Sequence, residues 1–139
     1  MRSGASSKLP EVVRQLAEAG CDTPRLDAEL LLPLGEEAIE RRLAREPVAY
    51  ILGTKGFRWI ELEVDRRVLI PRPDTETLVE VALSSGARRI HDVGTGSGAV
   101  ALALKNEQPD LAVTGSDSSV DAVDVARANA DRPIASAAR

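Results

Sequence analysis

The sequence predicts an α/β fold, in which a small helical subdomain and a β-hairpin precede strands that alternate with helices. Three patterns support this prediction. Apolar residues recur at helical spacing in the first third, alternate with charged residues near residue 60, and then form two short runs, each followed by a helix-like segment. We therefore expect an N-terminal helical subdomain over residues 1–53, a β-hairpin and linker over 54–73, and a partial sheet domain over 74–139.

Three short helices are expected in the first part of the chain. Apolar residues at helical spacing predict the first helix over Leu9–Ala19, and Gly20 ends it. Thr23 stands where a capping residue would precede a second helix over Pro24–Leu32, because proline is favoured in a first turn. A charged third helix is expected over Glu36–Arg45.

A hairpin and a further helix are expected next. Gly53–Gly56 predicts a turn, and the alternation of apolar and acidic residues predicts a half-buried strand over Trp59–Val64. Val68–Ile70 is the expected hairpin partner of that strand. Asp74 is expected to cap a helix over Thr75–Leu83.

The last part of the chain follows a strand–loop–helix–strand–helix order. The expected elements are a strand over 88–93, a glycine loop over 94–98, a helix over 99–105, a strand over 111–115 and a helix over 120–130. Two strands joined by a helical crossover pair in parallel with a right-handed connection. We therefore expect a right-handed βαβ unit with two parallel strands.

Composition excludes several classes of function. The net charge is −4 and no basic stripe is present, so direct nucleic-acid binding is not expected. No apolar run has the length of a signal peptide or a membrane span, which predicts a cytoplasmic protein without membrane contact. Cys21 is the single cysteine and His91 the single histidine, so neither a disulfide nor a metal site is expected.

The candidate chemistry lies in a glycine-rich loop. Glycines at alternate positions leave the main chain bare where a strand turns into a helix, so a ligand can approach closely and meet the amides of the helix N-terminus. A glycine-rich turn without a ligand is the alternative. The expected ligand-binding residues of this loop are Gly94, Thr95, Gly96, Ser97 and Gly98.

Two acidic residues indicate which ligand the loop binds. Asp117 ends the next strand, where a carboxylate can accept hydrogen bonds from both hydroxyls of a ribose, although it can also be a loop or capping residue. The loop reads G-x-G-x-G after Asp92, whereas dinucleotide sites usually read G-x-G-x-x-G. Loop amides suit a carboxylate and Asp92 suits an ammonium group, directly or through water. The spacing therefore favours S-adenosyl-L-methionine over NAD.

Four stretches resemble one known family. They are Thr23-Pro-Arg-Leu-Asp-Ala-Glu-Leu-Leu-Leu32, Glu46-Pro-Val-Ala-Tyr-Ile-Leu-Gly53, Val68-Leu-Ile-Pro-Arg-Pro-Asp-Thr-Glu76 and Asp92-Val-Gly-Thr-Gly-Ser-Gly98. The chain resembles the release factor glutamine methyltransferases (the HemK or PrmC family) from about Leu9 to Ala130. The run from Ile70 to Glu76 is much more specific than the glycine loop, which such methyltransferases share.

The resemblance implies a fold and a reaction. The fold would be the first half of a Rossmann-type (class I) methyltransferase sheet, with one edge of the strand over 88–93 open to aggregation or self-association. A methyl group would pass from S-adenosyl-L-methionine to the glutamine side-chain amide of the Gly-Gly-Gln loop in a peptide chain release factor. Gly94 to Gly98 would line the methionine part of the cofactor and Asp117 would hold its ribose. Arg72 and Pro73 fall in a segment that lies beside the cofactor pocket in the family, although a stiff linker would read the same way.

The sequence departs from the family in two respects. The helical region is shorter than is usual, and the family's substrate-positioning Asn-Pro-Pro-Tyr motif is absent, because neither Asn106 nor Asn129 precedes Pro-Pro. We therefore expect a truncated chain and name no catalytic residue. The alternatives are a non-catalytic S-adenosyl-L-methionine-binding fragment, a dinucleotide-binding module of oxidoreductase type, and a largely unfolded remnant.

Overall fold

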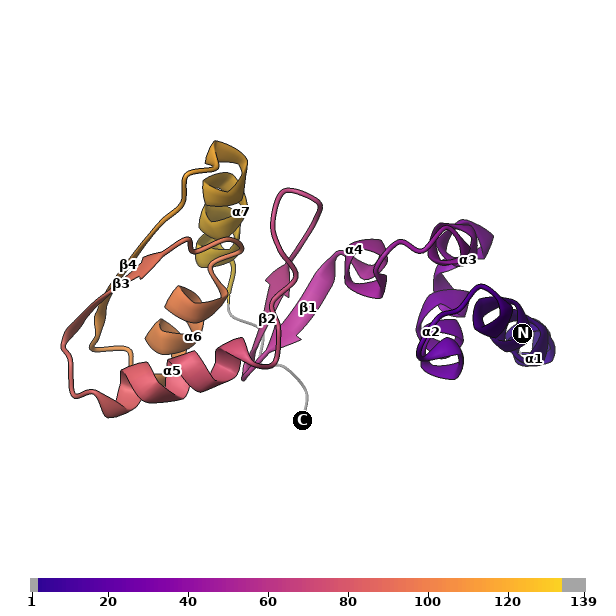
Figure 1. The fold of residues 1–139 in the computed structure, drawn as a ribbon, viewed down its shortest axis with the longest axis horizontal. Coiled ribbons are helices and arrows are strands. Elements are labelled where there is room, and N and C mark those ends of the chain that lie inside the picture. Colours follow the sequence, from indigo (N-terminus) through magenta and orange to yellow (C-terminus); the bar gives the residue numbers. More distant parts are fainter. Residues whose placement is uncertain (1–2, 134–139) are drawn as a thin grey trace. The chain divides into compact units, whose positions relative to one another are not determined.

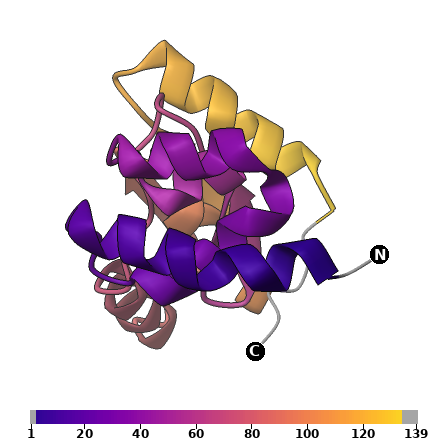
Figure 2. The ribbon, with the colours of Figure 1, turned by 90° about the vertical axis from the view of Figure 1, so that its right-hand side faces the viewer.

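The computed structural model describes residues 3–133, which fall into two compact units, Met1–Leu52 and Gly53–Arg139. The described part of the first unit is helical (Figures 1 and 2). Its elements are α1 (Ser3–Glu18), α2 (Pro24–Leu31), the short 3₁₀ helix η1 (Leu32–Leu34), α3 (Glu36–Leu43) and α4 (Val48–Leu52). All three expected helices are confirmed, although α1 begins earlier than expected and α4 was not expected.

The core of this unit is aliphatic. Helix α1 packs against α2 and α3, and α4 packs against both α2 and α3. Leu16, Ala28 and Leu31 are completely buried at the centre. Around them lie the other buried residues of the unit, Val12, Cys21, Ala38, Ile39 and Ile51. The buried position of Cys21 fits the interpretation of this thiol as a packing residue.

The predicted side-chain cap at the start of α2 is wrong. Thr23 precedes the helix, but its hydroxyl accepts no hydrogen bond from the helix. The hydroxyl instead donates to Oδ1 of Asp27 at 2.8 Å, while Nε of Arg42 donates to Oδ2 at 2.8 Å. The Asp27 side chain is only 3% exposed. A buried carboxylate that lacked these partners would be strongly destabilising, so the Thr23 hydroxyl serves Asp27 and not the helix end.

The second unit begins with a hairpin whose position differs from the expected one. Strand β1 (Thr54–Phe57) pairs antiparallel with β2 (Ile60–Glu63), so Gly53–Gly56 is mostly strand and Trp59 lies in the turn. Val68–Ile70 is not a strand; it contributes the buried side chain of Val68, and Leu69 is 72% exposed. The prediction failed because β1 has only four residues and no clear apolar pattern, whereas Val68–Ile70 is a continuous apolar run.

Arg58 explains why the hairpin turns where it does. Its φ of 48° lies in the left-handed region, which is uncommon for a residue with a side chain. Two anchors hold it there. The Arg58 N–H donates to Oε1 of Glu76 at 2.8 Å, and its guanidinium donates to both carboxylate oxygens of Glu107 at 2.6 and 2.7 Å. Glu107 raises the pKa of Arg58 further, so the guanidinium stays charged.

The rest of the second unit confirms the expected parallel pairing. Its elements are α5 (Thr75–Ser84), β3 (Arg89–Val93), α6 (Ala99–Glu107), β4 (Ala112–Ser116) and α7 (Val120–Asp131). β3 pairs with β4 in parallel, and among the described residues the sheet has these two strands. Helix α6 packs against both strands, against α5 and against β2, and α7 packs against β2.

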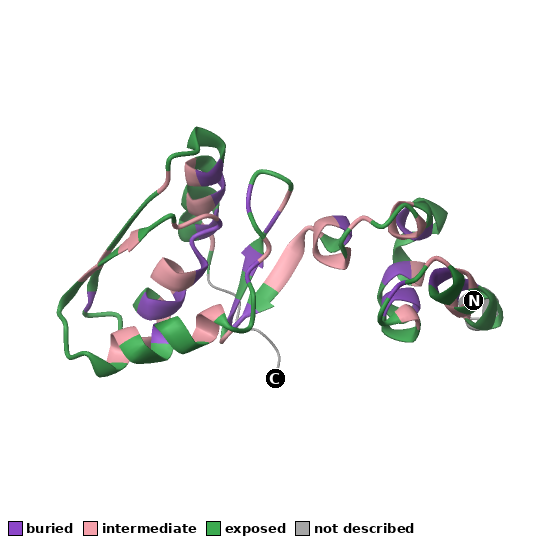
Figure 3. Ribbon diagram, in the orientation of Figure 1, coloured by how far each residue is buried: buried purple, intermediate pink, exposed green. Residues whose placement is uncertain are grey.

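The hairpin and α6 carry the core of this unit. Buried residues alternate with exposed ones along β2 (Figure 3). Phe57, Ile60, Leu62, Val79 and Leu104 are each at most 2% exposed. Phe57 is the only aromatic side chain among the buried residues of the described chain, so the core depends on close aliphatic packing.

The predicted side-chain cap of α5 is also wrong. Asp74 already has helical backbone angles, φ −59° and ψ −31°, and its carboxylate makes no capping bond. Helix α7, in contrast, has a side-chain cap. The hydroxyl of Ser119, a residue type that commonly caps helices, accepts the Ala122 N–H at 3.2 Å.

Candidate functional site

The candidate site lies where β3 and β4 end. Asp92 pairs with Gly115 and Val93 with Ser116, so the two strands finish level with each other. The glycine loop leaves β3 at Gly94, and Asp117 follows β4 directly. The carboxyl ends of adjacent parallel strands are the common ligand site of open α/β sheets.

Strand β4 holds the beginning of the glycine loop. The N–H groups of Gly94 and Thr95 both donate to the carbonyl of Ser116, at 2.8 and 2.9 Å. The Gly98 N–H then donates to the Thr95 carbonyl at 2.8 Å and closes the turn into α6. Gly94, Gly96 and Gly98 have φ values of 73°, 56° and 86°, a region that residues with a Cβ rarely adopt.

The three glycines have different surroundings. A Cβ added to Gly94 or Gly96 would have no atom within 4 Å, so the main chain is bare and accessible at these two positions. A Cβ at Gly98 would lie 3.2 Å from Cδ1 of Leu102 and 3.4 Å from Cβ of Ala126. Gly94 and Gly96 therefore leave room for a ligand, whereas at Gly98 the side chains of Leu102 and Ala126 leave little room for a Cβ.

Asp92 orients the loop. Its Oδ2 accepts a hydrogen bond from the Thr95 hydroxyl at 2.8 Å. Gly115, opposite Asp92 in β4, provides the space for this contact, because a Cβ there would lie 2.9 Å from the Thr95 Oγ1 and 3.1 Å from its Cβ. Sequence reasoning missed the role of Gly115, since the glycine lies inside a predicted strand.

Asp117 is already hydrogen-bonded within the protein. Its Oδ2 accepts the Gly96 N–H at 2.9 Å and its Oδ1 accepts the Ser119 N–H at 3.0 Å. These two main-chain bonds, that of Ser119 above all, lower the pKa of the carboxyl, so Asp117 is ionised at neutral pH. Each oxygen keeps further acceptor capacity, which a pair of ribose hydroxyls can use.

The loop amides are less available than expected. The N–H groups of Gly94, Thr95, Gly96 and Gly98 all donate within the protein. Within residues 3–133, only the Ser97 N–H of this loop has no acceptor. The expectation that the loop amides in general would hold a ligand carboxylate is therefore narrowed to the Ser97 N–H and the N-terminus of α6.

The structure places Arg72 and Pro73 in the turn that begins α5. The carbonyl of Arg72 accepts the Thr75 N–H at 3.1 Å, and that of Pro73 accepts the Glu76 N–H at 3.0 Å. Both residues are exposed. In the described part of the chain, the Arg72 side chain makes no hydrogen bond or ion pair with the glycine loop. The other site candidates are joined by hydrogen bonds around the glycine loop, whereas the described bonds of Arg72 and Pro73 are to the first turn of α5.

One buried polar residue at the site was missed by sequence reasoning. Asn129 is 5% exposed, and its side-chain amide donates to the main-chain carbonyl of Ser97 at 2.9 Å. Ser97 is also buried, with 3% of its surface exposed. The helical spacing of the sequence could have indicated that this position is buried. Ala122, Val125 and Asn129 follow the i, i+3, i+7 pattern that marks the buried face of α7, so a polar residue there needs a partner in the core.

His91 does not show the geometry of a general base at this site. Its side chain points from β3 to β4, where Nδ1 lies 2.7 Å from Oγ1 of Thr114 and Nε2 lies 2.9 Å from Oγ of Ser116. Both ring nitrogens are therefore occupied on the exposed sheet surface. Among the described residues there is no cluster of three or more His, Cys, Asp or Glu able to hold a metal ion.

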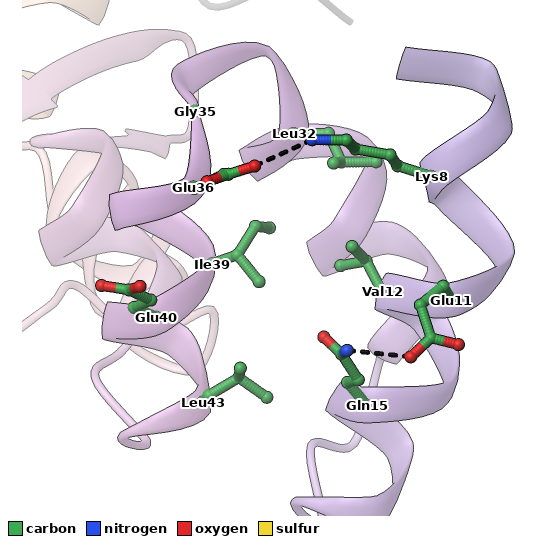
Figure 4. A pocket seen from close by; sticks show the side chains of 10 residues that line it. All are labelled: Lys8, Glu11, Val12, Gln15, Leu32, Gly35, Glu36, Ile39, Glu40 and Leu43. Carbon is green, nitrogen blue, oxygen red and sulfur yellow. Dashed lines mark hydrogen bonds and ion pairs between the residues drawn. The ribbon is translucent and has the colours of Figure 1, made fainter. Parts of the chain in front are cut away.

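The helical unit contains a separate groove of about 700 Å³ between α1 and α3 (Figure 4). Its apolar lining is Val12, Leu32, Ile39 and Leu43. Lys8 reaches across one end, with its Nζ 2.8 Å from Oε1 of Glu36. No residue of the glycine loop lines this groove.

In the described chain, no helix has the length and apolarity that would span a membrane.

Known proteins resemble this chain in both halves. The Methyltransferase small domain family matches residues 73–138, which include the glycine loop and Asp117. Proteins named release factor glutamine methyltransferase match a larger part. That of Aliivibrio fischeri is 42% identical over 149 residues, which cover 88% of this chain and 52% of the relative. That of Vibrio cholerae is 41% identical over 151 residues, covering 89% and 53%.

A shorter match has a higher identity. The release factor glutamine methyltransferase of Streptococcus pneumoniae is 47% identical over 98 residues, which cover 68% of this chain and 35% of the relative. The two longer alignments exceed the 139 residues of the chain, so some positions of those relatives have no counterpart here. The chain spans about half the length of the curated relatives it matches, and it belongs to the release factor glutamine methyltransferase family.

Proposed function

We propose that the chain binds S-adenosyl-L-methionine at the carboxyl ends of β3 and β4, as the cofactor-binding part of a methyltransferase. One observation carries this proposal above all. Gly94 and Gly96 are left-handed, free of neighbours where a Cβ would be, and adjacent to the ionised Asp117. A nucleoside needs a bare main chain to lie against and a carboxylate for its ribose hydroxyls.

Each polar part of the cofactor has a suitable partner here. Asp117 accepts from the ribose hydroxyls with the lone pairs that Gly96 and Ser119 leave free. The Ser97 N–H and the N-terminus of α6 attract the methionine carboxylate. Asp92 draws the ammonium group, directly or through water, while still accepting from Thr95. The bound cofactor would supply the methyl group, and the protein would hold and orient it.

The substrate follows from the relatives. Their name identifies the substrate as a release factor and the modified residue as a glutamine. We propose the same partner for an enzyme that contains this chain, with the Gly-Gly-Gln loop as the methylated segment. The amide nitrogen is a poor nucleophile, so the reaction depends on holding it in line with the methyl group. No residue of this chain is proposed for that step, because the Asn-Pro-Pro-Tyr motif is not among the 139 residues.

The test is calorimetric titration of the chain with S-adenosyl-L-methionine and S-adenosylhomocysteine. Saturable binding is expected, together with a loss of at least tenfold in affinity for Asp117→Ala, since charge-assisted hydrogen bonds contribute about 1.5–3 kcal/mol each. Asp110→Ala is the matched control, because this exposed carboxylate lies at the other end of β4.

Three outcomes would count against the proposal. A folded chain that binds neither compound would refute it. Equal loss of affinity in the Asp117 and Asp110 variants would refute the assigned role of Asp117. Preferential binding of NAD would favour the dinucleotide-binding alternative, which the G-x-G-x-G spacing argues against.

A further inference from the structure

The buried side chain of Asn129 makes three hydrogen bonds within the second unit. Its Nδ2 donates to the carbonyl of Ser97 at 2.9 Å and to that of Glu63 at 3.0 Å, while its Oδ1 accepts the Glu63 N–H at 2.8 Å. All three partners are main-chain groups. The side chain thus joins α7 to the last residue of β2 and to the glycine loop, 66 and 32 residues away in sequence.

The bonds to Glu63 resemble those of a neighbouring strand. The amide of Asn129 gives one donor and one acceptor to the carbonyl and N–H of a single residue, as a peptide group does across an antiparallel pair. Asn and Gln carry both functions in one planar amide, and Asp or Leu in this position would leave at least one buried main-chain group unpaired. The chemistry of residue 129 is therefore specified by its partners.

The third bond, from Asn129 to the Ser97 carbonyl, holds the end of the glycine loop that enters α6. Gly94 and Gly96 make the loop permissive, because residues without a Cβ have a wide choice of backbone angles. Ser116 and Asp117 hold the first part of the loop from β4. The bond from Asn129 to Ser97 is the tie on the other side, where the loop enters α6.

We infer that Asn129 is a positioning residue of the cofactor loop, and that the loop keeps its binding geometry through the tie to α7 and β2. It touches no proposed ligand atom itself, and its effect passes through Ser97. The consequence for affinity rests on the proposed cofactor function, whereas the ordering of the loop can be measured without ligand.

The experiment compares Asn129→Ala with Val125→Ala in the full chain. Val125 is 2% exposed, lies on the same buried face of α7 one turn earlier, and makes no side-chain bond to the loop. Both variants remove a buried side chain, so both reduce the stability of α7. Amide hydrogen exchange of Thr95, Gly96 and Gly98 is read by NMR in the ligand-free proteins, and S-adenosylhomocysteine affinity is measured by calorimetry.

Asn129→Ala is expected to speed exchange of the loop amides about tenfold relative to Val125→Ala, as for the loss of one buried hydrogen bond worth about 1.4 kcal/mol. The affinity for S-adenosylhomocysteine falls by a similar factor in this variant and less than twofold in Val125→Ala. Asn129→Gln, which keeps the amide, is expected to restore part of both values.

The outcomes separate the two proposals. Equal loop exchange in the alanine variants, once corrected for their global stability, would overturn the role of Asn129 even if the wild type binds the cofactor. Faster exchange in Asn129→Ala with no binding by the wild type would refute the proposed function and leave the positioning role supported. If Asn129→Ala does not fold, Asn129→Asp is compared with Val125→Ala, because Asp keeps the size of the side chain and lacks the amide donor to the Ser97 carbonyl.

Discussion

Gly115 of β4 lies directly against the side chain of Thr95 in the glycine loop. In Gly115→Ala the new Cβ would lie 2.9 Å from Oγ1 and 3.1 Å from Cβ of Thr95, both closer than an ordinary contact. A rotation of the Thr95 side chain would remove the first overlap but not the second. The loop backbone then shifts by a few tenths of an ångström, away from the Ser116 carbonyl that binds the Thr95 N–H at 2.9 Å.

The expected cost combines two effects. Inserting a methyl group into a close contact costs about 1–3 kcal/mol. The shift also weakens the bond from the Thr95 hydroxyl to the Asp92 carboxylate, and hydrogen bonds to charged groups contribute about 1.5–3 kcal/mol. We expect Gly115→Ala to lower the free energy of unfolding by about 2 kcal/mol. Affinity for S-adenosylhomocysteine should fall about tenfold, which corresponds to about 1.4 kcal/mol.

Urea unfolding and calorimetric titration measure these two quantities. Gly56→Ala is the matched control, because Gly56 also lies within a strand and a Cβ there would have no atom within 4 Å. That variant should change stability by less than about 0.5 kcal/mol. If the two variants behave alike, the contact between Gly115 and Thr95 does not control the loop and the steric reasoning is wrong.

Two further predictions concern the carboxylates. Asp27→Asn leaves Arg42 without its ionic partner in the helical unit and should lower the free energy of unfolding by about 2–4 kcal/mol, measured by urea denaturation; a loss below about 1 kcal/mol would show that the pair adds little. The second concerns Asp117, whose pKa is lowered in the folded chain by the N–H groups of Ser119 and Gly96. Its contribution to stability is therefore fully present above the ordinary carboxyl pKa of about 4 and is lost as the pH falls through the lowered value. The stability difference between wild type and Asp117→Asn should be constant from pH 8 to about 5 and narrow below about 4, and a difference that already narrows near pH 6 would contradict the assigned bonds.

The elements with strong periodicity could be predicted from sequence. The three expected helices of the first unit and the parallel pair of β3 and β4 appear in the expected order, although α1 begins earlier than expected. The hairpin could not be placed, because β1 is four residues long and its turn depends on distant carboxylates. Glu76 and Glu107 fix Arg58 in a left-handed conformation, and no local pattern contains that information.

The candidate site shows the same division. The positions of Gly94, Gly96 and Asp117 around the ends of β3 and β4 follow from motif and order alone. Which loop amides remain available does not, because it depends on bonds to Ser116 and Asp117 that form only when β4 lies beside β3. Asn129 could have been found from its place on the apolar face of α7, although its partners could not.

Polar side chains that reach the main chain of distant elements compensate for what the second unit lacks. Neither of its sheets has more than two strands in the described residues, and a two-stranded sheet is marginally stable alone. Arg58 connects the hairpin turn to α5 and α6, and Asn129 connects the other end of the hairpin to α7 and the glycine loop. The hairpin is thereby held at both ends by bonds that a substitution in its own strands would not remove. Loss of the Asn129 connection should consequently loosen the glycine loop as well, because Asn129 bonds both to Glu63 of the hairpin and to Ser97 of the loop.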